Sequence, residues 1–253
     1  MSESERMPIC QLLEWDTNFF GMRIARLLSS ILTSEIVLQA ESWCAENRID
    51  CLYFLAGTQD PETILLAERY KYSLVDIRMT LALRINSRAA SVRNDAPHEI
   101  RPARADDIGM LKEIAGDIYT DTRFYFDRRF PPELCARLYE TWIEESCKGY
   151  AQAVLVAQYH GQPAGYITCH VYPDHGQIGL LGISPAARKL GFGAGLIHAA
   201  VDWFAAHDLN DVTVVTQGRN IAAQRLYQQC GFLTEKCELW YHRWFNPSAG
   251  TGE

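Results

Sequence analysis

The sequence lacks three features, each of which would have indicated a class of protein. Its 253 residues contain no apolar run near the roughly 18 residues that a membrane-spanning helix needs. The N-terminal MSESERMPIC has no basic region followed by an apolar one, so we expect no secretory signal and predict a cytoplasmic location. Basic residues number 24 against 31 acidic ones, and the net charge of −7 disfavours nucleic acid or a membrane surface as partner.

Cysteine pairs at metal-binding spacing are also missing. The eight cysteines form no C-x-x-C pair and are widely scattered, which argues against zinc sites and redox motifs. We therefore predict no metal site and expect free thiols, most of which fill the core.

The chain reads as two α/β domains joined by a polar segment. Residues 85–99, rich in Ser, Asn and Ala, are the best linker candidate, which gives a small N-terminal domain, 1–90, and a larger domain, 98–246. Apolar periodicity predicts helices over 36–48, 61–70, 196–204 and 220–232, and a further helix that ends near 119 and has Asp106 or Asp107 as its N-cap. Strands are predicted at 50–57, 72–85, 99–102, 153–159, 162–171, 177–184, 211–217 and 237–245. We expect Trp15, Phe19 and Phe20 to lie in the core.

The stretch ISPAARKLGFGAGLIHAA, residues 183–200, places three glycines ahead of an apolar run. It is not a Walker loop, because no Lys and hydroxyl pair follows Gly191. It is not a dinucleotide fingerprint, because Leu196 occupies the place of the third glycine. Arg188–Gly193 instead has the form R-x-x-G-x-G before an amphipathic helix, where successive backbone N–H groups can point at one anion. A plain turn is the alternative for this hexapeptide taken alone.

In its surroundings this stretch resembles the acyl-CoA loop of the GCN5-related N-acetyltransferase (GNAT) superfamily. The preceding LLGISP, the opening EIRPARADDIGMLKEIA and the late RNIAAQRLYQQCGF resemble other signatures of that family, in the family's order. The resemblance implies a GNAT fold with a mixed, mostly antiparallel central sheet. It also implies an N-acetyltransferase in which an amine attacks the thioester of acetyl-CoA directly, within a ternary complex.

The same resemblance implies which residues face acetyl-CoA. The strand would offer main-chain groups to the pantetheine arm and the acetyl carbonyl, and the loop would hold the pyrophosphate. Asn220 would contact the cofactor, and Tyr227, two helical turns later, would also protonate the departing thiolate. A half-buried aromatic without a catalytic role is the alternative for Tyr227. The residues implied for the strand and the loop are Leu181, Gly182, Ile183, Arg188, Lys189, Leu190, Gly191, Phe192, Gly193 and Ala194.

A general base is not assigned, because residues 177–181 contain no glutamate where many family members have one. His170, Asp174 and His175 are near in sequence, and we expect each to be a solvated turn residue.

Two segments indicate which class of amine accepts the acetyl group. LEWDTNFFGMRIARL, residues 13–27, and residues 122–149 resemble the TDP-fucosamine acetyltransferases of bacterial surface-polysaccharide pathways. The resemblance covers almost the whole chain and implies a nucleotide-linked amino-dideoxy sugar as acceptor. Because such a substrate needs cations for its diphosphate and aromatic rings for its base, we expect Arg123, Phe124, Tyr139 and Trp142 to bind it. A solvated loop with aromatic anchors is the alternative for the segment that holds Arg123.

Two other functions stay open at this point. One is an acetyltransferase of a protein or peptide amine, and the other is a non-catalytic module that binds acetyl-CoA. Relatives suggest a homodimer.

Overall fold

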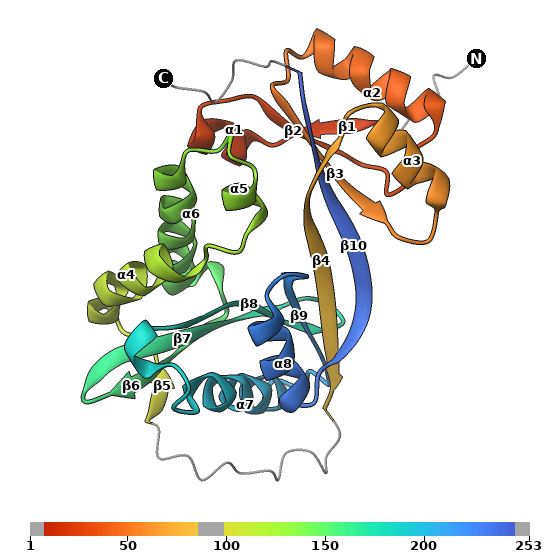
Figure 1. The fold of residues 1–253 in the computed structure, drawn as a ribbon. Helices are drawn as coiled ribbons and strands as arrows, with labels where there is room; N and C mark the ends of the chain where they lie inside the picture. Colours follow the sequence, from red (N-terminus) through yellow and green to blue (C-terminus); the bar gives the residue numbers. More distant parts are fainter. Residues whose placement is uncertain (1–7, 86–98, 246–253) are drawn as a thin grey trace. The chain divides into compact units, whose positions relative to one another are not determined.

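The computed structural model of the protein describes residues 8–85 and 99–245, and its chain divides into two compact units (Figure 1). Unit 1 comprises Met1–Arg78, Thr122–Leu134 and Cys237–Glu253, and unit 2 comprises Met79–Asp121 and Cys135–Lys236. The predicted pair of domains, 1–90 and 98–246, cuts the chain once, whereas the units cut it four times. The predicted linker falls almost wholly outside the described residues, so the predicted bounds stay a prediction.

Unit 1 is a small α/β unit whose sheet runs β1-β2-β3-β10. β2 and β3 are parallel, whereas the β1–β2 and β3–β10 pairs are antiparallel. Side chains cap two of the helices: the Thr33 side chain accepts from Ile36 N, and the Asp60 side chain accepts from Thr63 N. The elements are β1 (Cys10–Leu12), α1 (Glu14–Phe20), β2 (Ile24–Leu27), α2 (Ser34–Glu46), β3 (Cys51–Gly57), α3 (Pro61–Arg69), α5 (Arg123–Phe126) and part of β10 (Leu233–Trp244).

Side chains of a strand alternate between its two faces, and rings stack on both faces of the β3–β10 pair. On one face, Phe54 and Tyr241 stack and join a core with α2 and α3. On the other, Tyr53 stacks on its cross-strand partner His242. Phe124 and Phe130 contact this second face, and Phe20 packs on both of them.

The N-terminal aromatic motif is only partly in the core. Phe20 is buried, as predicted, whereas Phe19 is only half-buried. Trp15 is 46% exposed, so its predicted core position is wrong. Trp15 lies in the first turn of α1 and stacks flat on Phe19, one helical turn later, with the ring centroids 4.9 Å apart.

Unit 2 is a mixed α/β unit with the strand order β9-β8-β7-β6-β5. All these pairs are antiparallel except the parallel β8–β9 pair, which confirms the predicted fold class. A two-residue turn, His160-Gly161, joins β6 to β7 with positive φ at both residues. The elements are β5 (Ile100–Pro102), α4 (Ile108–Ile118), α6 (Pro132–Glu145), β6 (Ala153–Tyr159), β7 (Gln162–Val171), β8 (Gly176–Ile183), α7 (Phe192–Ala205), β9 (Asp211–Gln217), α8 (Ile221–Gln229) and part of β4 (Ser73–Arg84) and β10.

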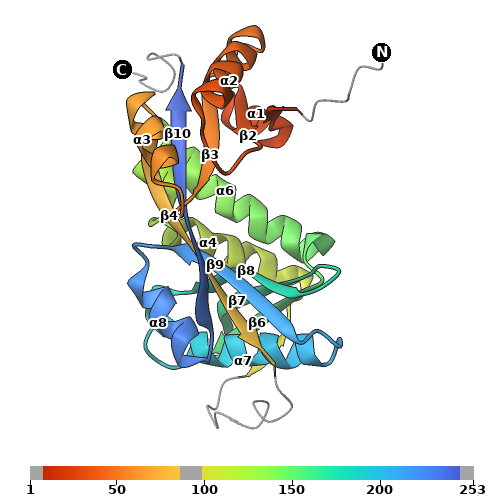
Figure 2. The ribbon, with the colours of Figure 1, turned by 90° about the vertical axis from the view of Figure 1, so that its right-hand side faces the viewer.

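The two faces of the unit 2 sheet carry different helices, α4 on one side and α7 on the other (Figure 2). The predicted apolar stripe of α7 packs into the core: Leu196, Ile197, Ala200 and Phe204 are buried there. Asp107 precedes α4, but its carboxylate does not cap that helix. It accepts from the Arg101 guanidinium and from Arg104 N, which lowers its pKa.

All eight cysteines are free thiols and five are buried, as predicted. Within the described ranges, no helix is both long and apolar enough to cross a membrane. Among the same residues, no group of three or more His, Cys, Asp or Glu side chains could hold a metal ion.

Candidate active site

A β-bulge in β8 shapes the centre of unit 2. Ile167 pairs with Leu181 and Cys169 with Ile178, so Gly179 and Leu180 together face Thr168. The Leu180 N–H donates to Thr168 Oγ1 at 2.8 Å. The extra residue reverses the alternation of faces, which re-aims the last residues of β8, the strand predicted to contact acetyl-CoA.

Two glycines of β8 show this reversal. A Cβ on Gly176 would lie 2.5 Å from Phe204 of α7, and one on Gly182 would lie 2.8 Å from Ile118 of α4. Residues six apart in a regular strand point to the same face, yet these point to opposite ones.

The glycine-rich loop has the backbone that an anion site needs. Lys189 (φ 63°) and Gly191 (φ 89°) adopt left-handed conformations, and residues Arg188–Gly191 are exposed. Gly191 is the N-cap of the 14-residue helix α7 and has no side chain that could cap it. The first N–H groups of the helix therefore have no capping bond from Gly191 and can donate to an anion. These features fit the pyrophosphate of acetyl-CoA, which the sequence predicted at this loop.

The second motif glycine has a packing role. A Cβ on Gly193 would lie 2.8 Å from Leu226 Cδ2, so Gly193 allows α7 to approach α8 closely. Phe192, between the two glycines, is buried in the core, which leaves only its main chain for contact with a cofactor.

Helix α8 carries both other residues of the predicted cofactor set. Asn220 is its N-cap, and its side-chain oxygen accepts from Ala223 N at 3.1 Å. Tyr227 is buried rather than half-buried, and burial raises the pKa of its hydroxyl. Among the described residues, no hydrogen bond involves that hydroxyl.

A second tyrosine pair lies beside Gly182. The Tyr166 hydroxyl donates to the Tyr119 hydroxyl at 3.1 Å, and the Tyr119 ring stacks on Tyr139 with centroids 4.5 Å apart. Burial raises the pKa of Tyr119, and the nearby charge of an ionised Tyr227 would raise it further. A Cβ on Gly182 would lie 2.7 Å from the Tyr166 ring, so this residue has to be glycine for the ring to fit. Neither Tyr119 nor Tyr166 belongs to a sequence motif, so no signal in the sequence indicated them.

The general base stays unassigned. His170 packs over Gly179 with its Nε2 3.3 Å from Thr168 Oγ1, and burial lowers its pKa. His170 is therefore half-buried on a sheet face, and the predicted solvated turn is wrong for it. Asp174 is exposed and half-buried His175 is hydrogen-bonded to it, as a turn pair.

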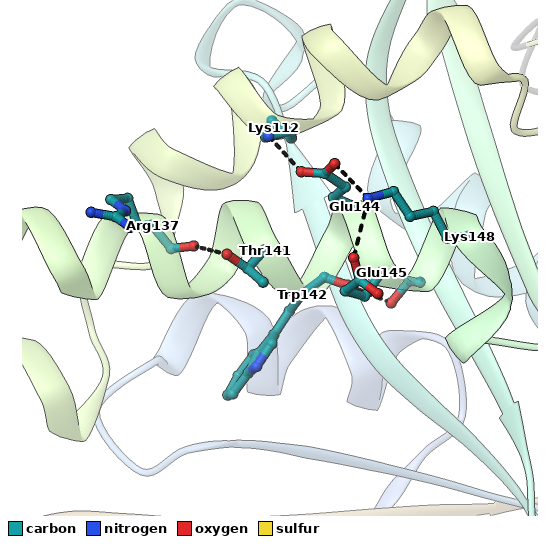
Figure 3. A network of polar contacts seen from close by, with 8 residues as sticks. Lys112, Arg137, Thr141, Trp142, Glu144, Glu145 and Lys148 are labelled. Carbon is teal, nitrogen blue, oxygen red and sulfur yellow. Dashed lines mark hydrogen bonds and ion pairs between the residues drawn. The ribbon is translucent and has the colours of Figure 1, made fainter. Parts of the chain in front are cut away.

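The four predicted substrate residues fall into different units. Tyr139 and Trp142 lie on α6 in unit 2, with their rings in edge contact at 5.2 Å. In Figure 3 the Trp142 side chain points away from the ion pairs that Lys112, Glu144 and Lys148 make along α6 and α4. Arg123 and Phe124 lie on α5 in unit 1.

Arg123 is held in a cluster that the sequence analysis did not find. Its guanidinium carbon lies 4.2 Å from the ring centroid of Tyr53, 4.4 Å from that of Phe124 and 4.3 Å from that of Trp240. The alternating residues Trp240, His242 and Trp244 on one face of β10 were the available signal.

The comparisons with known proteins agree with this architecture. The model of the acetyltransferase (GNAT) family matches residues 115–232. A dTDP-fucosamine acetyltransferase of Escherichia coli is 26% identical over 243 residues, which cover 94% of this chain and 100% of that protein. A spore coat polysaccharide biosynthesis protein of Bacillus subtilis is 25% identical over 146 residues, 58% of this chain and 50% of that protein.

Solved structures show the same fold at low identity. A GCN5-related N-acetyltransferase from Sphaerobacter thermophilus superimposes with a TM-score of 0.63 at 13% identity, over 94% of this chain and 76% of that one. A Staphylococcus epidermidis protein described as functionally unknown reaches 0.64 at 13% identity, over 97% and 94% of the two chains. Residues 115–232 thus match the acetyltransferase (GNAT) family, and this match and the named acetyltransferase relative support an N-acetyltransferase that uses acetyl-CoA as donor.

Proposed function

We propose that the protein acetylates the amine of a nucleotide-linked amino-dideoxy sugar, such as a dTDP-4-amino-4,6-dideoxyhexose, by direct attack in a ternary complex. One observation carries the proposal: the match to the Escherichia coli enzyme covers 94% of this chain and all of that protein. It therefore includes the N-terminal residues that lie outside the family match at 115–232. The name of the Bacillus subtilis relative, a polysaccharide biosynthesis protein, supports the same substrate class.

Acetyl-CoA supplies an activated acetyl group as a thioester. On this chain, the main chain of Leu181–Ile183 and the loop Arg188–Ala194 would hold it, and Asn220 would fix the start of α8 beside it. Tyr227 would donate its proton to the departing thiolate. The Tyr227 hydroxyl carries its proton at neutral pH, since burial raises the pKa of this phenol above its usual value.

Arg123 and Phe124 of unit 1, and Tyr139 and Trp142 of unit 2, stay the residues that the sequence predicts for contact with the acceptor. A cytoplasmic location and a homodimer stay predictions of the sequence.

A substrate panel tests the proposal. The purified protein is incubated with acetyl-CoA and a set of dTDP-linked 3-amino and 4-amino sugars, and release of free thiol is followed. We expect turnover on at least one sugar. Absence of turnover across the panel, together with turnover on peptide amines, would overturn the sugar acceptor. Binding of acetyl-CoA without turnover on either class would indicate a non-catalytic module.

A further inference from the structure

The Arg123 cluster of unit 1 contains a hydrogen-bonded relay whose protons can all be placed. Arg123 Nη1 lies 3.1 Å from His242 Nε2, and arginine can only donate, so Nε2 is the acceptor. The proton of this neutral imidazole is then on Nδ1, which donates to Asp127 Oδ2 at 2.7 Å. Trp244 Nε1 donates to the same oxygen at 2.8 Å. The relay thus fixes the guanidinium through a buried imidazole and a carboxylate.

The charge state of the relay agrees with this assignment. His242 is fully buried, and burial, together with the charge of Arg123, lowers its pKa to about 4. Burial alone would raise the pKa of Asp127, but the hydrogen bonds from His242 and Trp244 outweigh it and the pKa is lowered. At neutral pH the relay therefore consists of a guanidinium, a neutral imidazole and a carboxylate.

The Arg123 guanidinium is held by three aromatic rings but uses few of its hydrogen-bond donors. Three rings surround it, and within residues 8–85 and 99–245 its only hydrogen-bond acceptor is His242. Arginine carries five N–H donors, so four of them have no acceptor within these described residues. Asp16 is near enough for Arg123 to oppose the rise that burial causes in its pKa, but forms no ion pair with it. Tyr53 adds a buried hydroxyl without a partner in the described chain.

We propose that Arg123 is the centre of an oxyanion site in unit 1 that binds the diphosphate of the acceptor nucleotide, with His242 and Asp127 as positioning residues. This inference rests on the proposed function and deepens it. A fixed guanidinium with free donors can form two parallel hydrogen bonds with a phosphate. It therefore binds phosphate more strongly than a freely rotating ammonium group at the same place would. Arg123 is half-buried, so part of the residue stays accessible to a ligand.

Binding of dTDP to the full chain, without acetyl-CoA, tests the site directly. We expect Arg123→Gln to raise the Kd of dTDP roughly ten- to a hundredfold, because charge-assisted hydrogen bonds are lost. Arg123→Lys keeps the charge but loses the fork, and should still raise the Kd several-fold. Arg26→Gln is the matched control: it removes the same charge from unit 1 at an exposed residue whose guanidinium donates to the Gln11 side chain. It should leave the Kd unchanged.

His242 variants test the positioning role. His242→Gln keeps an acceptor for Arg123, whereas His242→Leu does not. We expect the KM for the sugar nucleotide to rise in the order wild type, His242→Gln, His242→Leu, with kcat little changed in the Gln variant. A purely structural role would instead lower thermal stability and kcat together.

The outcomes separate this inference from the proposed function. Because acetyl-CoA also carries phosphates, its KM is measured in the same variants and should not change. If Arg123→Gln and Arg123→Lys both bind dTDP as the wild type does, or weaken acetyl-CoA instead, the site is refuted while sugar acetylation still stands. If the wild type neither binds dTDP nor acetylates any nucleotide sugar, the proposed function fails and the inference fails with it.

Discussion

Acidification should destabilise the protein through His242, and the size of the effect follows from its burial. The imidazole is fully buried and neutral, accepting from Arg123 and donating to Asp127. In the unfolded chain it takes up a proton near pH 6.5, but in the folded chain only near pH 4. Between these values the unfolded state binds more protons, so the free energy of unfolding falls as the pH falls.

The magnitude is set by the difference between the two pKa values. Each pKa unit corresponds to about 1.4 kcal/mol, so lowering the pKa from 6.5 to about 4 gives a loss of about 3 kcal/mol. The stability is fully present above pH 6.5 and lost as the pH approaches 4. His170, whose pKa burial also lowers, adds a loss of the same sign, so wild type alone does not isolate His242.

Urea unfolding between pH 4 and 7.5, followed by tryptophan fluorescence, measures this loss. His242→Gln cannot titrate, and its free energy of unfolding should therefore depend less on pH than that of wild type, by about 3 kcal/mol over the window. The two proteins are compared at each pH, so the contributions of the other histidines cancel in the difference between the two free energies of unfolding. Parallel curves for wild type and His242→Gln would refute the assignment of a neutral buried imidazole.

Three further predictions concern unit 2. Tyr227→Phe keeps the ring in the core but removes the proton donor, so kcat should fall roughly a hundredfold with an unchanged circular dichroism spectrum; full turnover would refute the acid role. Gly182→Ala would force a methyl group against the Tyr166 ring and should lower stability by about 1–3 kcal/mol, whereas Gly116→Ala on α4 meets only the flexible end of Glu140 and should be neutral or stabilising. Equal melting temperatures for these two variants would contradict the packing argument. Gly191→Val should raise the KM for acetyl-CoA, because a β-branched residue resists a φ of 89°; an unchanged KM would count against the loop.

Periodic elements could be predicted from the sequence, and irregular ones could not. The stripe of α7 and the hairpin of β6 and β7 are local patterns, which the structure confirms. The bulge in β8 has no local signature, since it depends on how Thr168 and its neighbours pair across the sheet. For the same reason the sequence predicted the loop after β8 but not the faces to which Gly176 and Gly182 point.

The candidate site shows the same limit. Asn220 and Tyr227 belong to one helix and one motif, so sequence spacing predicted them together. The partners of Arg123 are Tyr53 and His242, about 70 and 119 residues away along the chain, and only pairing of β3 with β10 brings them together. The predicted domains cut the chain at a single place. Unit 1 also includes residues 122–134 and the C-terminal strand, and no single cut can assign these segments to the N-terminal part.

The central claim is that the chain transfers an acetyl group to the amine of a nucleotide sugar. The most direct measurement is the ratio of kcat/KM for a dTDP-linked amino-dideoxy sugar to that for a peptide amine, with the products identified by mass spectrometry. We predict a ratio far above one, a product carrying a single amide-linked acetyl group, and one thiol released per product. Equal or greater kcat/KM for the peptide amine would contradict the account.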